Sequence, residues 1–599
     1  MSFFNFNPAV RAATQGVTSK LGRHLDQQSQ TTPSATVIPF RRFHASEKQS
    51  PPDRPPHALR LYYLFLASTA FVQQAKGTAT SQYLDDKLDS VIQNVMKENN
   101  IAGLSLGILS PSGSVEFGAW GNRTETGDKV TPDTIFGIGS LSKSFLSASL
   151  GILMQDFQDG VNRTALPHGV TRFDWDTKVA ALLPGEWKTE DDFSTKQTDL
   201  VDLLSHITGL PTHDLSYSPD DTPRDLFRQH YEYNNQMYVT ASYIVSKFSG
   251  IPYRDFVEQR ILLPLNMSSS TLHPDRVSSL DRFSKTWSPS GRRIPFFADD
   301  KKMALIAGAG GVISDVQDLL QWAKLILNGG VVVGSERNST VIIPSSTFNL
   351  ATTGHSIVSP AGDGTFSVME YGLGWLRTAY RGHESVMHNG GAPGVSSMCA
   401  VFPLDNFAVV LLSNTAGRGS EAVVFAIADR ILGLPTPSSD DSINSTVTPT
   451  SSAQLLPSQT VAPSTHTTLN LAGTYSNAGY GNFTLCSSSK VNTVTGISPT
   501  QNSTELYSVS SRFWGTHIRL TPVPGTNYDY AVHHTNLYVD GYGADKSAFE
   551  DPLFEFKASF MEERGKVVGF GLFVAEGETW RAKKGGSVRD VADAWFDKV

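Results

Sequence analysis

Apolar residues along the chain recur at the spacing of helices in some segments and form short continuous runs in others. Helices are predicted where apolar side chains lie three and four positions apart, because such side chains share one helix face. These helices cover residues 83–99, 145–157, 237–248 and 422–432. Strands are predicted at the apolar runs 101–109, 115–120, 397–402 and 408–412. The pattern describes helices packed on an antiparallel sheet.

The C-terminal part of the chain has a different pattern. Residues 436–468 are rich in Ser, Thr and Pro with almost no large apolar residues, which predicts a linker and favours O-glycosylation. From residue 469 to residue 599, short β-rich runs alternate with Gly and Asn turns and predict a small antiparallel barrel or meander. The runs are 471–475, 481–485, 517–520, 553–560 and 567–573.

Residues 1–82 are predicted to be a targeting or disordered segment. The apolar run 61–72 has twelve residues, fewer than the ~20 that span a bilayer, and Arg54 and Arg60 precede it as in a signal peptide. Some sixty residues come first, however, and they bear Arg, Ser and Thr with few acids, as mitochondrial presequences do. A signal peptide, a signal anchor, an organelle presequence and a misassigned start are the alternatives, and membrane association is expected only through this run.

Seven Asn-x-Ser/Thr sequons favour the secretory route, so that a secreted glycoprotein is predicted. They lie at Asn122, Asn162, Asn266, Asn338, Asn444, Asn482 and Asn502. The two cysteines, Cys399 and Cys486, fall in different predicted domains, and Cys399 is expected to be a small buried apolar residue.

Composition narrows the functional classes. The chain has 599 residues, of which 39% are hydrophobic and 10% aromatic, as in globular proteins. The net charge is −8, and no basic stripe is interleaved with aromatic residues, so no nucleic-acid partner is expected. There is no His-Glu-x-x-His motif and no dinucleotide or Walker fingerprint, and therefore neither a metal nor another cofactor is predicted. Oligomeric state is not indicated.

The first candidate for chemistry is Ser140-Leu141-Ser142-Lys143, which follows the apolar run 135–139 and begins a helical pattern. Positions i and i+3 share a helix face, so Lys143 can reach the hydroxyl of Ser140. A buried lysine can act as the base that a serine nucleophile needs. The alternative is that Ser140 is only an N-cap. Ser487-Ser488-Ser489-Lys490 has the same spacing but lies in a polar run.

Two further motifs add candidate residues. Tyr233-Asn234-Asn235 precedes a helical pattern that ends at Gly250, where a phenol and an amide can face one cavity; a turn cap is the alternative. His388-Asn389-Gly390-Gly391 precedes a predicted buried strand, where glycines allow close approach of a ligand and a backbone N–H can stabilise an oxyanion. The alternative is a Gly-rich hairpin turn with a structural histidine.

In this order, the three motifs resemble those of the serine β-lactamase and penicillin-binding-protein superfamily, and specifically its class C β-lactamase-like branch, peptidase family S12. That family has Ser-x-x-Lys, then Tyr-x-Asn, then Lys-Thr-Gly or His-x-Gly. Three further segments resemble it, namely 203–210, 308–314 and 371–375. The resemblance covers about residues 84–435, within a catalytic domain assigned to 83–435.

The resemblance implies an α+β fold, in which helices flank an antiparallel sheet beside an all-α subdomain, and a lipocalin-like domain at residues 469–599. It implies that Ser140 is acylated, that Lys143 and Tyr233 share the acid–base work, and that Asn235 orients the substrate. His388, Asn389, Gly390 and Gly391 would contact the substrate, and the N–H groups of Ser140 and Gly391 would form the oxyanion hole.

The third motif departs from Lys-Thr-Gly at His388 and Asn389, which removes a permanent cation and a hydroxyl that attract a substrate carboxylate. Strong β-lactam hydrolysis is therefore not expected. The resemblance predicts a serine hydrolase that acts on a small-molecule or peptide ester or amide. A transesterase of small-molecule biosynthesis and an inactive binding protein on the same scaffold are the alternatives.

Overall fold

The computed structural model describes most of the chain from residue 82 onward. The described residues are 82–162, 164–189, 192–208, 210, 231–334, 339–417, 419–435, 471–487, 505–510, 513–526, 528–574 and 586–599. The targeting segment with its apolar run 61–72, the linker predicted at 436–468 and the sequons at Asn338, Asn444 and Asn502 lie outside them. Within these ranges, no helix has both the length and the apolar character needed to cross a bilayer.

An antiparallel sheet of eight strands forms the centre of the first domain. Its order is β2-β1-β14-β13-β12-β11-β10-β9. The strands are β1 (Gly103–Leu109), β2 (Val115–Gly121), β9 (Ser356–Ser359), β10 (Met369–Tyr371), β11 (Leu376–Tyr380), β12 (His383–Ala392), β13 (Val395–Phe402) and β14 (Phe407–Ser413). Every residue of β1, β13 and β14 is buried, which explains why these strands appear in the sequence as continuous apolar runs.

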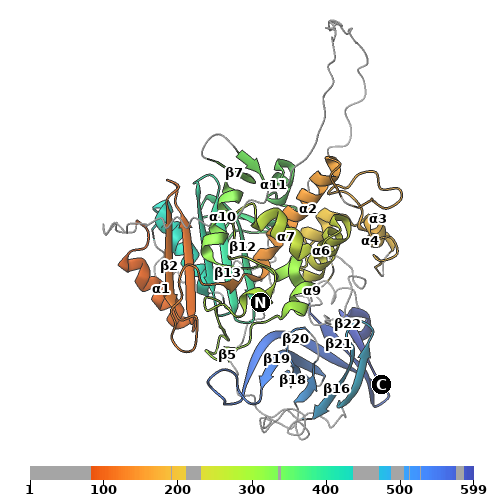
Figure 1. The fold of residues 1–599 in the computed structure, drawn as a ribbon. Coiled ribbons are helices and arrows are strands. Elements are labelled where there is room, and N and C mark those ends of the chain that lie inside the picture. The colour runs from red at the N-terminus through yellow and green to blue at the C-terminus, as the bar shows by residue number, and fades with distance from the viewer. Residues whose placement is uncertain are drawn as a thin grey trace, which may run out of the picture. The chain divides into compact units, whose positions relative to one another are not determined.

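Alternate residues of β14 pack into two different cores, because successive side chains of a strand point to opposite faces. Val409 and Leu411 pack with α1 (Asp86–Glu98) and α12 (Gly419–Leu432). Val410 and Leu412 pack on the other face with α2 (Ser142–Gln158) and α10 (Val316–Leu327). Helices therefore cover both faces of the sheet, with α1 on one side and α2, α6, α7 and α9 together on the other (Figure 1).

The remaining elements of this domain are short apart from two helices that border α2. These two are α6 (Asn235–Ser249) and α9 (Asp300–Gly310). The shorter helical elements are η2 (Gly139–Leu141), α3 (Val179–Leu182), α4 (Asp192–Gln197), α5 (Leu200–Leu204), α7 (Tyr253–Val257), η4 (Glu258–Leu262), α8 (Pro274–Val277) and α11 (Ser345–Ala351). Three strand pairs complete it: β3 (Phe136–Gly137) with β6 (Ile313–Ser314), β4 (Thr286–Trp287) with β5 (Arg293–Ile294), and β7 (Val331–Val333) with β8 (Ser339–Val341).

Helix α2 is the buried helix on which the first sequence motif lies. All its residues from Ser142 to Met154 are buried, although several are serines. A buried hydroxyl needs a hydrogen-bond partner, and these serines donate to carbonyl groups of the preceding turn. Ser144 donates to Leu141 O at 2.8 Å, and Ser149 donates to Phe145 O at 2.7 Å. The small side chains let neighbouring elements approach the helix closely.

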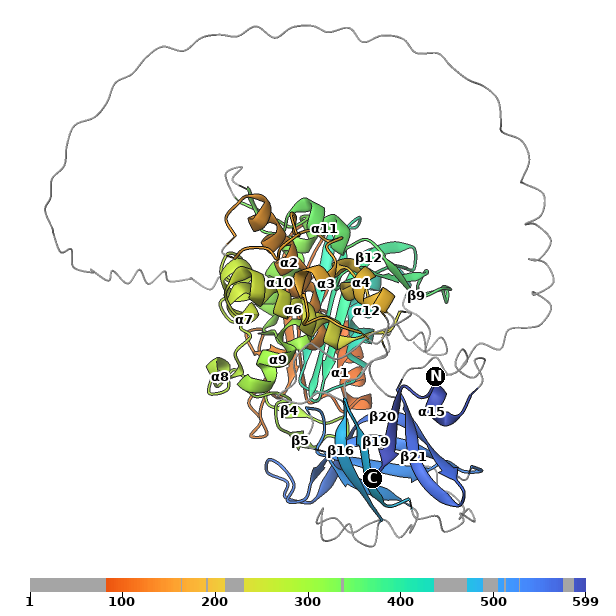
Figure 2. The ribbon, with the colours of Figure 1, turned by 90° about the vertical axis from the view of Figure 1, so that its right-hand side faces the viewer.

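The C-terminal domain is a closed antiparallel barrel of eight strands (Figure 2). They are β15 (Gly473–Asn477), β16 (Gly481–Ser487), β17 (Leu506–Val509), β18 (His517–Pro522), β19 (Asp529–Tyr538), β20 (Phe549–Glu563), β21 (Lys566–Phe573) and β22 (Ala594–Lys598); α15 (Val588–Val591) precedes the last strand. Tyr475, Phe560, Phe570 and Phe596 fill its interior. The expected α+β class, with a sheet flanked by helices and a barrel after it, is confirmed.

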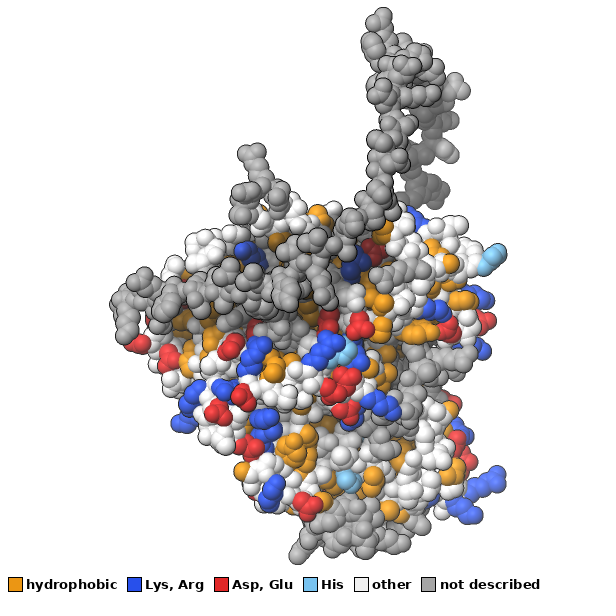
Figure 3. Space-filling view, in the orientation of Figure 1, with side chains coloured by type: hydrophobic (Ala, Val, Ile, Leu, Met, Phe, Trp, Pro, Cys, Tyr) orange, Lys and Arg blue, Asp and Glu red, His pale blue; other side chains and the backbone are white. Residues whose placement is uncertain are grey.

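Positive and negative side chains are interspersed on the face of the molecule shown in Figure 3, and the hydrophobic side chains there form small patches. Both cysteines are free. Cys399 is fully buried in β13, as expected, and burial raises the pKa of its thiol to about 12, so this thiol is unreactive at neutral pH.

Candidate active site

Ser140 lies in a tight turn between β3 and helix α2. The turn is the 3-10 element η2, and it begins at Gly139, whose φ of +51° favours a residue without a side chain. Ser142 holds the turn in place: its Oγ donates to Gly139 O at 2.7 Å and accepts from the N–H of Val312 at 3.0 Å. The N-cap residue of α2 is Leu141. The alternative interpretation of Ser140 as the helix cap is therefore not supported.

Lys143 lies one turn further along the same helix and is fully buried. Its Nζ donates to Ser140 Oγ at 3.1 Å, to Asn235 Oδ1 at 2.6 Å and to Ala309 O at 2.8 Å. A buried amine needs such partners, because an unpaired buried polar group is costly. Three elements, η2, α6 and α9, thus meet at one side chain, and Ser140, Lys143 and Asn235 form one hydrogen-bonded group.

Tyr233 reaches the same amine from the residues before α6. The Nζ of Lys143 lies 4.6 Å from the centre of the Tyr233 ring, and the ring is buried. Asn234 begins α6 by accepting from the N–H of Gln236 at 2.9 Å, and its own N–H donates to His206 Nδ1 at 3.1 Å. The middle residue of Tyr-x-Asn is therefore the cap that orients the tyrosine and the asparagine on either side of it.

His206 is a supporting residue that the sequence motifs did not single out. It is fully buried, and its ring centre lies 4.5 Å from that of Tyr233 and 4.7 Å from that of Tyr371. Burial, and then the charge of Lys143, lower its pKa well below the usual value, so it is neutral. Its only signal in the sequence was its place in the segment 203–210.

His388 lies in the interior of the domain. Its side chain is buried, its Nε2 accepts from the hydroxyl of Tyr371 at 2.9 Å, and its Nδ1 contacts the carbonyl oxygen of Asn389. Burial first, and then the charge of Lys143, lower the pKa of His388 to about 3. The Asn389 amide donates to Glu421 Oε1 of α12 at 2.7 Å. Residues 388–391 all belong to β12, and the turn follows at Gly394, whose φ is +71°.

Gly390 and Gly391 bring strand β12 against the nucleophile turn. A Cβ atom on Gly390 would lie 1.9 Å from Ile138 O, so no side chain fits there. A Cβ atom on Gly391 would meet nothing within 4 Å, and this glycine faces open space instead. Ser397 Oγ of β13 donates to Ile138 O at 2.6 Å and holds the two segments together. The backbone nitrogen of Gly391 lies close to Gly139, the residue before Ser140, since a Cβ atom on Gly139 would lie 2.8 Å from it.

A pocket of about 40 Å³ opens between these segments. It is lined by Gly139, Ser140, Asn235, Phe297, Ile306, Ala309, Gly310, Gly391, Ala392 and Trp514. Of the predicted site residues, Ser140, Asn235 and Gly391 line the pocket, while Lys143 lies beneath Ser140 and His388 and Asn389 have the contacts given above. Sequence reasoning missed the apolar wall. The sequence motifs include only the segment 308–314 of this wall, because Trp514 lies far away in the chain.

A second serine motif, at residues 103–107, does not lie in a turn at the pocket. Gly103-Leu104-Ser105-Leu106-Gly107 matches the Gly-x-Ser-x-Gly pattern of a nucleophile elbow, which requires a turn between a strand and a helix. These residues lie inside β1, and Ser105 is fully buried with its Oγ 3.5 Å from Thr131 O. This Gly-x-Ser-x-Gly sequence is therefore part of a central strand and not a nucleophile elbow.

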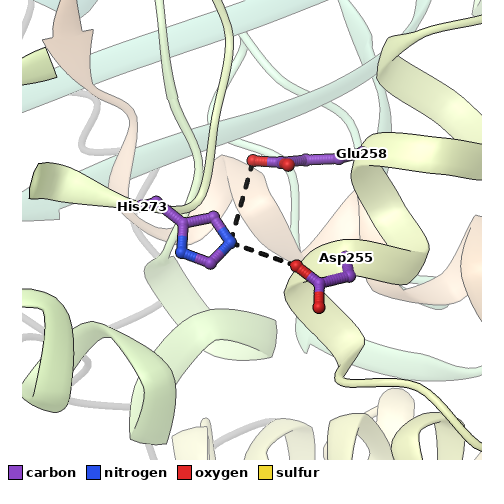
Figure 4. Close-up of side chains that lie close together, drawn as sticks. All are labelled: Asp255, Glu258 and His273. Carbon is purple, nitrogen blue, oxygen red and sulfur yellow. Dashed lines mark hydrogen bonds and ion pairs between the residues drawn. The ribbon is translucent and has the colours of Figure 1, made fainter. Parts of the chain in front are cut away.

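Asp255, Glu258 and His273 form a cluster of metal-ligating residue types away from the pocket (Figure 4). The His273 Nε2 lies 3.3 Å from Asp255 Oδ1 and 4.0 Å from Glu258 Oε1. Glu258 also accepts from Thr271 Oγ1 at 2.6 Å and pairs with Arg276 at 2.6 Å. These bonds outweigh the effect of burial and lower the pKa of Glu258. Because a guanidinium already neutralises the carboxylate, we assign the cluster to the ion pairs that hold η4 to the loop before α8.

Unguisins hydrolase ungD' of Aspergillus campestris is 26% identical over 377 residues, which are 59% of this chain and 66% of that protein. Unguisins hydrolase ungD of Aspergillus violaceofuscus is 26% identical over 385 residues, 59% of this chain and 65% of that protein. The matches therefore span just under two thirds of these relatives.

The structure resembles that of the octameric penicillin-binding protein homologue from Pyrococcus abyssi, with 19% sequence identity and a TM-score of 0.47. The match covers 86% of this chain and 99% of that chain. The family model for Beta-lactamase matches residues 88–432, more than half of the chain. This range contains η2, α2, α6 and the sheet that carries β12. The chain belongs to the beta-lactamase family.

Proposed function

We propose that this protein is a serine hydrolase that cleaves an ester or an amide through an acyl intermediate on Ser140. The observation that carries the proposal is the hydrogen bond of 3.1 Å between the Nζ of Lys143 and the Oγ of Ser140, at the base of a pocket that Ser140 lines. A serine hydroxyl becomes a useful nucleophile only when an adjacent base takes its proton.

The hydrogen bonds of Lys143 support its role as that base. Asn235 Oδ1 and Ala309 O can only accept, so two N–H groups of the amine are committed to them. The nitrogen also faces Ser140 Oγ at 3.1 Å. In the neutral amine, a lone pair directed at this oxygen can receive the serine proton. The same two acceptors hold the ammonium until its proton passes through Tyr233 to the leaving group, which leaves the amine neutral in the acyl-enzyme.

The proposed reaction has two balanced steps. Ser140 Oγ bonds to the substrate carbonyl carbon as its proton passes to Lys143, and the bond to the leaving alcohol or amine breaks as that group takes up the same proton through Tyr233. Water then bonds to the acyl carbon as it gives a proton to Lys143. The bond between the acyl carbon and Ser140 Oγ breaks as Oγ takes this proton, so the acid leaves and Ser140 is restored. The N–H groups of Ser140 and Gly391, on neighbouring segments at the pocket, are the proposed donors to the oxyanion.

The chemistry around β12 favours substrates without a recognised carboxylate. His388 is neutral and hydrogen-bonded to Tyr371, and the Asn389 amide donates to Glu421. Neither supplies the fixed cation that attracts the carboxylate of a β-lactam. Two relatives bear the name unguisins hydrolase, which supports hydrolysis as the reaction. We therefore propose neutral esters and amides as the substrate class.

The proposal is tested with Ser140→Ala in the full chain. Turnover of p-nitrophenyl esters and D-amino acid amides, and covalent labelling by a small fluorophosphonate, are measured for the wild type and the variant. We expect the variant to lose labelling and at least 10³-fold in turnover, because it lacks the hydroxyl that is acylated in the proposed reaction.

The chain offers a matched control in its other Ser-x-x-Lys motif. Ser487 lies in β16 of the barrel, and Ser487→Ala should leave both labelling and turnover at the wild-type level. Retention of turnover by Ser140→Ala would show that the proposed nucleophile is wrong. In a further assay, an alcohol is added and the ester it forms with the acyl group is detected. The amount of this ester measures how far an alcohol replaces water as the acceptor of the acyl group.

A further inference from the structure

The barrel inserts an aromatic pair into the catalytic domain. Phe513 lies between β17 and β18, and only 2% of its surface is exposed. It belongs to a core cluster with Ile135, Phe283 and Met303, all of which are residues of the catalytic domain. The Nζ of Lys302 on α9 donates to the carbonyl oxygen of Phe513 at 3.4 Å. This segment of the barrel is therefore anchored beside α9.

Trp514, the next residue, reaches the pocket of Ser140. Its ring stacks on Phe297 with 6.1 Å between the ring centres and 19° between the planes, and it meets Phe554 of the barrel edge to face at 6.2 Å. Contacts on both sides hold the indole in one orientation. Trp514 and Ser140 line the same pocket, so one wall of the candidate active site comes from the barrel.

The pocket is small for a substrate site. Its volume is about 40 Å³. A water-sized sphere needs roughly 10–15 Å³ by this measure, so there is room for about three non-hydrogen atoms beside the nucleophile. An acetyl group has this size. The neighbouring wall residues Phe297 and Ile306 are apolar, and they favour a hydrocarbon group over a charged one.

We propose that Trp514 determines specificity by closing the acyl side of this pocket, so that the enzyme takes short acyl groups of acetyl to propionyl size. The inference rests on the proposed function, because it assigns the acyl group of the Ser140 intermediate to this space. The barrel domain thereby forms part of the substrate site. Removal of the indole joins the pocket to the space that the ring occupied, and longer acyl chains then fit.

The experiment compares p-nitrophenyl acetate, butyrate and octanoate, whose intrinsic reactivities are similar. Values of kcat/KM are measured for the wild type, Trp514→Ala, Trp514→Leu and Trp514→Phe in the full chain, with thermal melting to verify folding. We expect the wild type to prefer acetate. The acetate-to-octanoate ratio should fall at least tenfold in Trp514→Ala, fall less in Trp514→Leu, and stay within about threefold in Trp514→Phe, which keeps an aromatic wall.

Trp595 is the matched control, because it lies in the same barrel, its indole donates to Asp597 at 2.9 Å, and it does not line the pocket. Trp595→Ala should keep the wild-type ratio. An unchanged ratio in both Trp514→Ala and Trp514→Leu would overturn the inference, and so would a wild type that hydrolyses none of the three esters. Turnover of acetate by Ser140→Ala would instead overturn the proposed function, so the two failures are distinguishable.

Discussion

Lys143 is held by oxygen atoms from three separate elements of the catalytic domain. Ser140 belongs to η2, Asn235 to α6 and Ala309 to α9, so the amine keeps its position only while all three are in place. The contact between Ser140 and Lys143 was predictable from the sequence, because residues three positions apart share a helix face. The contact with the carbonyl of Ala309 was not predictable, because any residue can supply a carbonyl and only the fold decides which one does.

Replacement of Lys143 by Met keeps the buried alkyl chain and removes the amine. We expect kcat/KM to fall by about 10²–10⁴, the usual contribution of a positioned base. Ester turnover and fluorophosphonate labelling measure the effect, with thermal melting as the check on folding. Lys196→Met, at an exposed position of α4, is the control and should retain wild-type turnover. A Lys143→Met enzyme within threefold of wild type would exclude Lys143 as the base.

The neutral state of His388 predicts a pH effect on stability. Its pKa is about 3 in the folded chain and about 6.5 when unfolded, so the unfolded state binds more protons between these values, and folding stability falls as the pH falls through this window. His388→Gln removes this effect. Between pH 6 and pH 4, the stability of the wild type should decline relative to that of the variant by about 1.4 kcal/mol per pH unit. Urea unfolding at each pH measures this, and parallel curves would contradict it.

At the scale of elements, the site depends on how closely β12 approaches the turn before α2. Gly390 allows this approach, because its α-carbon faces the carbonyl of Ile138 and the hydroxyl of Ser397 with no room for a further atom. Gly391, one residue later, faces open space. Adjacent glycines in one strand therefore have different roles, one in packing and one at the pocket.

This difference gives a matched pair of variants. Gly390→Ala places a methyl group 1.9 Å from Ile138 O, so the strand must shift, and we expect a loss of about 1–3 kcal/mol in the free energy of unfolding. Gly391→Ala adds the same atom where nothing lies within 4 Å, and its unfolding free energy should stay within about 0.5 kcal/mol of wild type. Denaturant unfolding compares them. Equal losses in both variants would refute the packing argument.

The elements with strong periodicity were predictable, and those defined by distant partners were not. Helices α1 and α6 and strands β1, β2 and β13 match the sequence pattern closely. Residues 388–391 looked equally like a hairpin turn, because glycines give no periodicity; pairing with β13 places them in a strand. In the barrel, β17, β19 and β22 were missed. They are short or carry polar residues such as His533 and His534, and ring closure rather than local pattern makes them strands.

At the scale of the whole molecule, the barrel and the catalytic domain share a core. Phe513 is buried among residues of the catalytic domain, and Arg292 lies over the ring of Phe549 at 4.2 Å. The backbone N–H of Ala544 donates to Glu125 at 2.7 Å. These contacts come from separate parts of the barrel, so the two domains are expected to unfold together.

Phe513→Ala tests this shared core. Truncation of a fully buried phenylalanine costs about 3–5 kcal/mol, and we expect that loss in the unfolding free energy of the full chain. Calorimetry shows in addition whether a single transition divides into two. Phe193→Ala is the control, because that ring is 62% exposed and its loss should cost under about 0.5 kcal/mol. A Phe513→Ala protein as stable as wild type would mean that this ring does not join the domains.

The pairing of β1 with β14 has a consequence for biosynthesis. Leu106 lies opposite Leu411 in the sheet, so a strand made early waits for a partner made some three hundred residues later. At a translation rate of about 5–20 residues per second, the wait is roughly 15–60 s. During this time, β1, whose residues are all buried in the folded protein, has only its hairpin neighbour and exposes an edge that can join other chains. Recombinant yield should therefore rise with slow, cool expression and with chaperones that shield nascent strands.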